Sequence, residues 1–172
     1  MLTPILFVLV LTVLVPAAVA GFMAAPWVPM RAKDTSRMVR LARVEPGETF
    51  LDMGSGDGRM CVAVVRAEPR AYSRGIELSV LPFLWSKVSA LVQKVSNIDI
   101  RFGNLFSADI SNVDVIAFFL MPKAMPRIKE KIEKEGKIGV RIFSYVFPVP
   151  GWEPVRIDKP DQTSIAIYEY RR

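Results

Sequence analysis

The chain has 172 residues, and its 23 lysines and arginines against 17 aspartates and glutamates give a formal net charge of +6. That length allows one domain with a sizeable hydrophobic core and is short for two. Histidine is absent, and the one cysteine is Cys61. These counts exclude an internal disulfide, zinc–histidine sites and catalysis by Ser-His-Asp or Cys-His groups, so any reaction here runs without an imidazole.

The amino-terminal stretch is uncharged from Leu2 to Trp27, which exceeds the roughly 20 apolar residues that cross a bilayer. A secretory signal peptide cleaved at Ala18–Ala20 is one interpretation, but no basic residue precedes the run and apolar residues continue beyond it. We therefore expect a transmembrane anchor over residues 1–25. The basic residues after it place the domain on the cytoplasmic side, or the matrix side in a mitochondrion; they are Arg31, Lys33, Arg37, Arg40 and Arg43. Because such residues are attracted to anionic lipid, the net charge requires no nucleic acid partner.

Strand and helix patterns alternate after the anchor. Asp34 or Thr35 is placed to cap a short amphipathic helix that ends near Val44, within a pre-domain segment over residues 26–44. Strands are expected at 49–53, 71–78, 97–104, 113–120, 138–147, 152–157 and 164–170, and helices at 59–67, 80–95 and 122–137. Alternation followed by a closing hairpin predicts an α/β fold over residues 45–172, with a mostly parallel, doubly wound sheet and an antiparallel edge.

A glycine-rich loop, GSGDG at residues 54–58, joins the first of these strands to the helix that follows. Glycine lets the backbone turn sharply there and lets a ligand approach without a side chain in between. Ligands of open α/β sheets bind beyond the carboxyl ends of the strands, where this loop lies. The GxGxG spacing matches neither the dinucleotide pattern GxGxxG nor the P-loop, and a tight turn without a ligand is the alternative for the loop alone.

Two further strand ends carry polar side chains that suit a nucleoside. Glu77 ends the second strand about 20 residues after the loop, where an acidic group accepts both hydroxyls of a ribose. Asn104 ends the third strand, where its amide would meet the exocyclic amine of an adenine; a turn asparagine is the alternative. With the loop, these residues predict a pocket for an adenosine that carries an amino-acid tail, which is S-adenosylmethionine.

The motifs LDMGSGDGR, GIEL and GNLF, in this order and spacing, resemble those of the seven-strand methyltransferases, whose fold is Rossmann-like. The whole chain is similar, more specifically, to the small membrane-anchored lysine methyltransferases that act on the ATP synthase c-subunit and on the adenine nucleotide translocase. The similarity includes the apolar amino terminus, PWVP at residues 26–29 and FPVPGWEP at residues 147–154. It implies a Rossmann-like seven-strand methyltransferase domain behind an N-terminal transmembrane helix.

The resemblance also implies roles for matched positions. Asp52 and Asp57 would border the methionine end of the cofactor, and Glu77 would hold the ribose. The full set expected to bind S-adenosylmethionine is Asp52, Gly54, Ser55, Gly56, Asp57, Glu77, Leu78, Asn104 and Leu105. Residues 26–29 would close over the methionine portion, which makes Trp27 and Pro29 candidates for the active site.

Methyl transfer from a sulfonium to an amine suits a chain without histidine. The leaving group departs neutral, so the enzyme mainly aligns the reacting atoms and keeps water out. A lysine loses its proton more easily when it is buried beside a positive sulfonium. Tyr145, Phe147 and Trp152 are candidates for an aromatic channel that receives the alkylammonium group, and core packing in the closing hairpin is the alternative for each.

The sequence thus predicts an S-adenosylmethionine-dependent protein-lysine N-methyltransferase that needs neither a metal nor a nucleic acid. Its protein substrate would lie in or at a membrane, where an anchored enzyme gains a high effective concentration of substrate. Two alternatives remain open: a methyltransferase for a lipid or lipophilic small molecule, and a non-catalytic, cofactor-binding assembly factor of the membrane.

Overall fold

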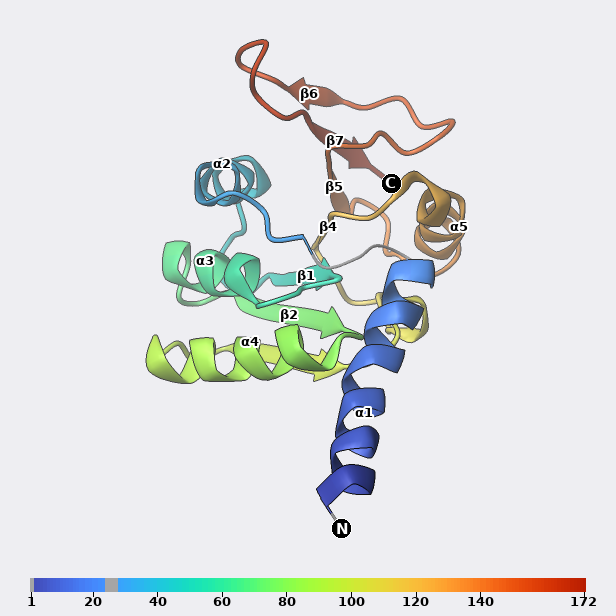
Figure 1. The fold of residues 1–172 in the computed structure, drawn as a ribbon. Helices are drawn as coiled ribbons and strands as arrows, with labels where there is room; N and C mark the ends of the chain where they lie inside the picture. Colours follow the sequence, from blue (N-terminus) through green and yellow to red (C-terminus); the bar gives the residue numbers. More distant parts are fainter. Residues whose placement is uncertain (1, 24–27) are drawn as a thin grey trace.

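The computed structural model describes residues 2–23 and 28–172, and it contains one seven-stranded sheet in the order β3-β2-β1-β4-β5-β7-β6 (Figure 1). The five parallel strands are β1 (Thr49–Met53), β2 (Tyr72–Glu77), β3 (Ile98–Phe102), β4 (Val115–Phe118) and β5 (Arg141–Tyr145). The chain closes with β6 (Arg156–Asp158) and β7 (Ile167–Arg171), and β7 runs antiparallel to both β5 and β6. The predicted parallel sheet with an antiparallel edge is confirmed.

Helices cover both faces of this sheet. On one face lie α2 (Ala32–Ala42), α3 (Arg59–Ala67) and α4 (Val80–Val92), and on the other lies α5 (Met125–Glu135) (Figure 1). Two short 3-10 helices, η1 (Leu105–Ser107) and η2 (Pro122–Ala124), follow the ends of β3 and β4. The predicted boundaries of α3 and β1 agree with the structure residue for residue.

The central strand β4 shows why the sequence is apolar without interruption in this region. Val115 and Ala117 belong to the buried cluster under α2 and α3, whereas Ile116 and Phe118 belong to the cluster under α5. Successive side chains of a strand point to opposite faces, so a strand covered on both faces is apolar at every position. The two clusters hold the sheet rigid at the edge where the glycine loop emerges.

The amino-terminal stretch forms α1 (Leu2–Met23), which contacts α4 (Figure 1). The transmembrane anchor predicted over residues 1–25 is not supported, because within residues 2–23 and 28–172 no helix is both long and apolar enough to cross a membrane. Trp27 lies outside the described residues.

The cap predicted for α2 is wrong. The helix begins at Ala32, with Arg31 at the position before it, so Asp34 lies in the first turn instead of preceding the helix. The Asp34 side chain is buried and accepts a hydrogen bond from the Tyr145 hydroxyl of β5. The local pattern assigned this carboxylate to the helix end, but in the structure it accepts a hydrogen bond from a distant strand.

Gly58, which precedes α3, is required by both its backbone and its surroundings. Its φ is 75°, and a Cβ there would lie 2.6 Å from Ile100 Cδ1 and 3.0 Å from Ser86 Cβ. Gly47 has a similar φ of 83° but faces open space. Substitutions at Gly47 and Gly58 therefore distinguish the cost of backbone strain alone from the added cost of a collision with α4 and β3.

We expect Gly47→Ala to lower the free energy of unfolding by about 1 kcal/mol, the cost of a left-handed conformation. Gly58→Ala should cost about 2–4 kcal/mol, because the added methyl group also collides with packed side chains. Urea unfolding of the two variants measures the difference, and equal losses would contradict the packing argument.

Candidate functional site

The carboxyl ends of β1 to β4 surround a pocket of about 890 Å³, part of which opens to solvent. All nine residues that the sequence predicted for cofactor binding line it: Asp52, Gly54, Ser55, Gly56, Asp57, Glu77, Leu78, Asn104 and Leu105. Pro29 lines it as well, from the segment that precedes α2.

The glycine loop approaches β2 closely at the floor of the pocket. The backbone N–H groups of Gly54 and Ser55 both donate to the carbonyl of Ile76, each at 3.0 Å. A Cβ at Gly75 would lie 2.7 Å from Ser55 Oγ, so a larger residue in β2 would push the loop away. Gly54 has a φ of 89°, and its missing side chain leaves room beside Leu120 in the lining.

Three carboxylates give the pocket its charge. Asp52 is 8% exposed, and burial, followed by the neighbouring charges of Glu77 and Asp57, raises its pKa well above the ordinary value. Glu77 accepts hydrogen bonds from the N–H groups of Gly56 at 2.8 Å and Ser79 at 2.6 Å. Because like charges are held together out of water, the pocket favours a ligand that brings positive charge.

Asn104 is a turn asparagine that also lines the pocket, and its contact with an adenine stays a prediction. Its Oδ1 accepts a hydrogen bond of 3.0 Å from the N–H of Phe106 and so caps η1, as a turn asparagine does. The same residue lines the pocket next to Leu105. The cap fixes the orientation of the side chain at the end of β3.

Arg59 ties the segment before α2 to the glycine loop. Its Nε and Nη2 donate to the carboxylate of Asp57, at 2.9 and 2.5 Å, and its Nη1 donates to the carbonyl of Met30 at 2.7 Å. Val28, Pro29 and Met30 therefore lie over the pocket and form part of its wall. Arg59 directly follows the glycine loop in the sequence, and its spacing alone does not reveal this link.

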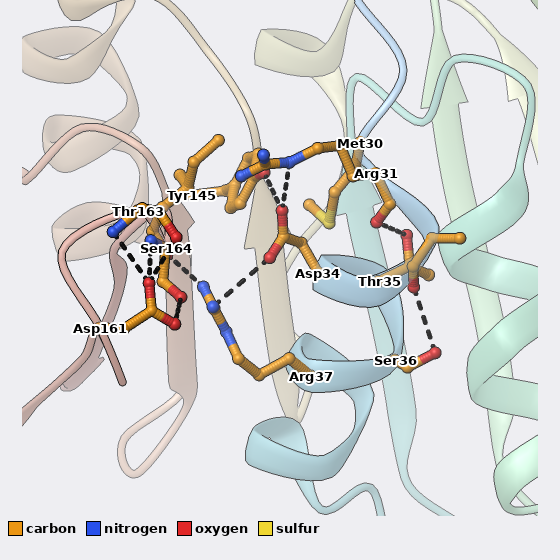
Figure 2. A network of polar contacts seen from close by, with 12 residues as sticks. Met30, Arg31, Asp34, Thr35, Ser36, Arg37, Tyr145, Asp161, Thr163 and Ser164 are labelled. Atoms are coloured by element: carbon orange, nitrogen blue, oxygen red, sulfur yellow. Dashed lines mark hydrogen bonds and ion pairs between the residues drawn. The ribbon is translucent and has the colours of Figure 1, made fainter.

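A buried polar network holds the same segment from the other side (Figure 2). Asp34 is 1% exposed and accepts hydrogen bonds from the Tyr145 hydroxyl at 2.7 Å and from Arg31 Nε at 2.8 Å. Burial opposes the ionisation of Asp34, but these bonds and the charges of Arg31 and Arg37 outweigh it and hold the pKa of the carboxyl below its ordinary value. Burial, and then the Asp34 bond, raises the pKa of Tyr145 to about 12. At neutral pH the pair is thus a carboxylate and a neutral phenol.

The three aromatic residues predicted to form a channel are not brought together. Tyr145 is buried and is not among the lining residues, but it meets the ring of Phe119, which lines the pocket, edge-on with centroids 4.9 Å apart. Phe147 packs against the core under α5, and Trp152 donates to Glu133 and packs on Tyr170, away from the pocket. The connection between β5 and β6 carries the last two toward α5, which a strand pattern alone does not reveal.

Other aromatic residues take the predicted place. Phe106, from η1, and Phe119, directly after β4, line the pocket together with Leu120 and Met30. The signal for Phe119 was present in the sequence, since Phe119 and Leu120 follow a buried central strand at its carboxyl end. The pocket therefore combines apolar and aromatic side chains with three carboxylates.

A family model described as the ANTKMT methyltransferase domain matches residues 52–156, which include the glycine loop and all three strand ends. The chain belongs to this family. The matched range also contains every pocket residue from Asp52 to Leu120, so the family assignment applies to the pocket itself.

Curated relatives agree with this assignment. A protein-lysine N-methyltransferase of Saccharolobus islandicus is 29% identical over 150 residues, which cover 84% of this chain and 92% of that protein. The mouse lysine N-methyltransferase of the ATP synthase C-subunit is 29% identical over 130 residues, which cover 75% of this chain and 51% of that protein. The mouse adenine nucleotide translocase lysine N-methyltransferase is 27% identical, with 77% of this chain and 57% of that protein covered. The chain thus spans about half the length of these mouse relatives.

Solved structures support the fold and the cofactor. An RNA methyltransferase from Salinibacter ruber in complex with S-adenosyl-L-homocysteine superposes with a TM-score of 0.79 at 28% identity, covering 84% of this chain and 93% of that one. A precorrin-6y methyltransferase from Geobacter metallireducens shares the fold alone, with a TM-score of 0.69 at 9% identity over 84% of this chain and 90% of that one. The domain is a seven-strand, Rossmann-like methyltransferase that uses S-adenosylmethionine.

The pocket residues fit this cofactor. Acidic side chains at the ends of β1 and β2 suit a ligand with a sulfonium, an ammonium group and a ribose. Ser55 Oγ is buried without a hydrogen-bond partner among the described residues, and it lies in the pocket wall. The individual roles assigned to these residues stay predictions.

We expect Tyr145→Phe to lower the free energy of unfolding by about 1–3 kcal/mol, because buried Asp34 loses a donor. The affinity for S-adenosylmethionine should also fall, roughly fivefold, or about 1 kcal/mol, because the segment over the pocket loses a fixed point. Chemical unfolding and calorimetric titration measure the two effects.

Tyr170→Phe is the matched control, because Tyr170 is equally buried and its hydroxyl accepts a hydrogen bond of 2.9 Å from Val149 N–H, far from the pocket. It should lose stability without losing affinity. Equal affinity losses in the two variants would show that the network around Asp34 has no particular link to the cofactor.

Proposed function

We propose that this chain transfers the methyl group of S-adenosylmethionine to the ε-amine of a lysine in a protein substrate. The observation that carries the proposal is that the pocket combines three carboxylates with apolar and aromatic side chains, in a chain without an imidazole. Named relatives that methylate protein lysines support the choice of acceptor. Roles for Trp27 and Pro29 near the reacting atoms follow from the resemblance alone.

Three kinds of residue divide the work in this proposal. Asp52 and Asp57 provide negative charge for the methionine end, and Glu77 has one lone pair left on each carboxylate oxygen for the ribose hydroxyls. S-Adenosylmethionine supplies the methyl group from its positive sulfonium. Phe106, Phe119 and Leu120 keep water away from the line of transfer.

The substrate lysine arrives as an ammonium ion and has to lose its proton before it attacks. Burial between the apolar side chains of the pocket lowers the pKa of that ammonium group. Phe119 offers an aromatic ring to the alkylammonium chain as it enters, whereas the Phe106 ring already has the Arg127 guanidinium over it, 4.0 Å from its centroid. No protein base is needed, which agrees with the absence of histidine.

We also propose that the substrate lies in or at a membrane and that the domain lies on the cytoplasmic face. This proposal is supported by the uncharged residues 2–27 and by the basic residues that follow. Of these, Lys33, Arg40 and Arg43 are exposed, while Arg31 and Arg37 pair with Asp34. A location at a membrane surface does not depend on a spanning helix.

Transfer of a labelled methyl group into membrane fractions tests the acceptor. We expect label in protease-sensitive material and, by mass spectrometry, in lysine. Label extracted with lipid would favour a lipophilic acceptor, and label in nuclease-sensitive material would favour RNA. Cofactor binding without any transfer would make the chain a non-catalytic assembly factor.

Asp52→Asn should make the protein more stable while it binds the cofactor less tightly. The pKa of Asp52 is raised in the folded chain, so its ionised form disfavours folding at neutral pH, and removing the charge should add roughly 1 kcal/mol to the free energy of unfolding. Loss of a charged partner should lower the affinity for S-adenosylmethionine about tenfold or more. In the unmodified protein the affinity should rise with pH as Asp52 loses its proton, and Asp52→Asn should weaken this dependence.

Asp114→Asn is the control for a carboxylate outside the pocket. Burial alone would raise the pKa of Asp114, but hydrogen bonds from Lys137 and the Thr49 N–H outweigh this effect and lower it. Its replacement should cost stability above the ordinary pKa of an aspartate and leave cofactor affinity unchanged. Full affinity in the Asp52 variant would remove this residue from the proposed site.

A further inference from the structure

Helix α4 presents its large apolar side chains to solvent. Leu81, Leu84, Trp85, Val88, Leu91 and Val92 are 58%, 52%, 63%, 51%, 78% and 72% exposed. They are spaced three or four residues apart, so they form one continuous stripe along the helix, here called the α4 stripe. The buried face carries small residues instead, with Pro82 and Ser86 against the sheet. An ordinary surface helix has the reverse arrangement.

Basic residues border the α4 stripe, and acidic ones are missing. Lys87 lies on the helix and Lys94 two residues after its end, and no aspartate or glutamate occurs between Glu77 and Asp99. An apolar face flanked by lysine, with a tryptophan on it, is the composition of helices that lie in the headgroup region of a bilayer. This charge selects a surface of anionic lipid.

The apolar surface continues onto α1, which contacts α4 (Figure 1). Four consecutive residues, Ile5, Leu6, Phe7 and Val8, are between 57% and 64% exposed. Because four successive residues of a helix point to all sides, this part of α1 is not covered by the domain. Figure 1 shows α1 beside the start of α4, at the edge of the sheet toward which the parallel strands point.

We propose that the α4 stripe docks on the surface of an anionic lipid bilayer, with α1 lying along the same surface. Leu78, which lines the pocket, is two residues from the start of α4. Docking therefore holds the mouth of the pocket next to the headgroups. The proposal concerns where the chain binds and does not depend on which acceptor it methylates.

A second copy of the chain fits the α4 stripe less well than lipid does. Two facing copies would bring their Lys87 and Lys94 side chains together with no acidic residue on α4 to pair with them. A fluid surface with negative headgroups accommodates the lysines and the apolar side chains together.

Trp85 allows a direct test in the full chain. Trp27→Phe and Trp152→Phe leave Trp85 as the one tryptophan. With vesicles of phosphatidylglycerol and phosphatidylcholine, we expect its emission to shift to shorter wavelength and to be quenched by brominated acyl chains. Because the probe sits on α4, the signal distinguishes docking of the α4 stripe from binding through α1 alone.

Paired variants measure the contribution of the stripe. Leu84→Glu with Leu91→Glu should lower the vesicle partition coefficient at least about tenfold, since two leucine side chains stay in water. Ile138→Glu with Val155→Glu changes two residues that are 81% and 61% exposed outside α4, and should leave partitioning unchanged. Lys87→Gln with Lys94→Gln should reduce the preference for phosphatidylglycerol about fivefold per lysine. Circular dichroism and cofactor affinity check that all three remain folded.

Three results would overturn the proposal. If the chain sediments with vesicles while Trp85 emission stays unchanged, α1 and not the α4 stripe binds the lipid. A shift of Trp85 emission with protein concentration, in the absence of vesicles, would assign the stripe to a second copy. A shift produced only by an added protein substrate would make the stripe a protein-docking surface.

Discussion

Glu77 connects the three neighbouring segments from which the pocket is built. Its carboxylate accepts hydrogen bonds from Gly56 in the loop after β1 and from Ser79 at the start of α4. Its backbone carbonyl accepts a hydrogen bond of 2.9 Å from Gly103, just after β3. One residue at the end of β2 thus fixes its neighbours on both sides, and it leaves part of its carboxylate directed to the pocket. The approach is possible because Gly75, two residues earlier, has no side chain to hold the loop away.

The arrangement stores electrostatic free energy that a cationic ligand releases. Three carboxylates lie in one pocket, and of these Asp52 is raised in pKa by burial and by the other two. Arg59 neutralises Asp57 but is also committed to the Met30 carbonyl, so it does not compensate Asp52. Buried like charges lower the stability of a fold, so stability alone does not explain this cluster. Its presence is understandable when the ligand carries the missing positive charge.

Local patterns were sufficient for most of the fold. The alternation of strands and helices, the bounds of β1 and α3, and the place of the glycine loop, Glu77 and Asn104 in the pocket follow from periodicity, glycine positions and the direction of parallel strands. The other pocket residues of the predicted set, such as Asp52, Asp57 and Leu105, came from the family resemblance. The failures have a common cause, which is contact between residues far apart in the chain. Asp34 meets Tyr145 across 111 positions, and the connection between β5 and β6 takes Trp152 away from the pocket. Neither contact can be predicted from the spacing of the residues near it in the sequence.

Helix α4 shows a different limit of pattern reasoning. Its apolar residues recur at helical spacing, which predicts a helix correctly, but α4 is apolar nearly all round, so spacing does not say which face packs on the sheet. The sheet selects the face with Pro82 and Ser86, because Gly58 and its neighbours approach α4 so closely that only small side chains fit; a Cβ at Gly58 would lie 3.0 Å from Ser86 Cβ. The large side chains are thereby turned outward. The same close packing that shapes the floor of the pocket thus creates the exposed stripe, so the binding site and the apolar surface arise from one constraint.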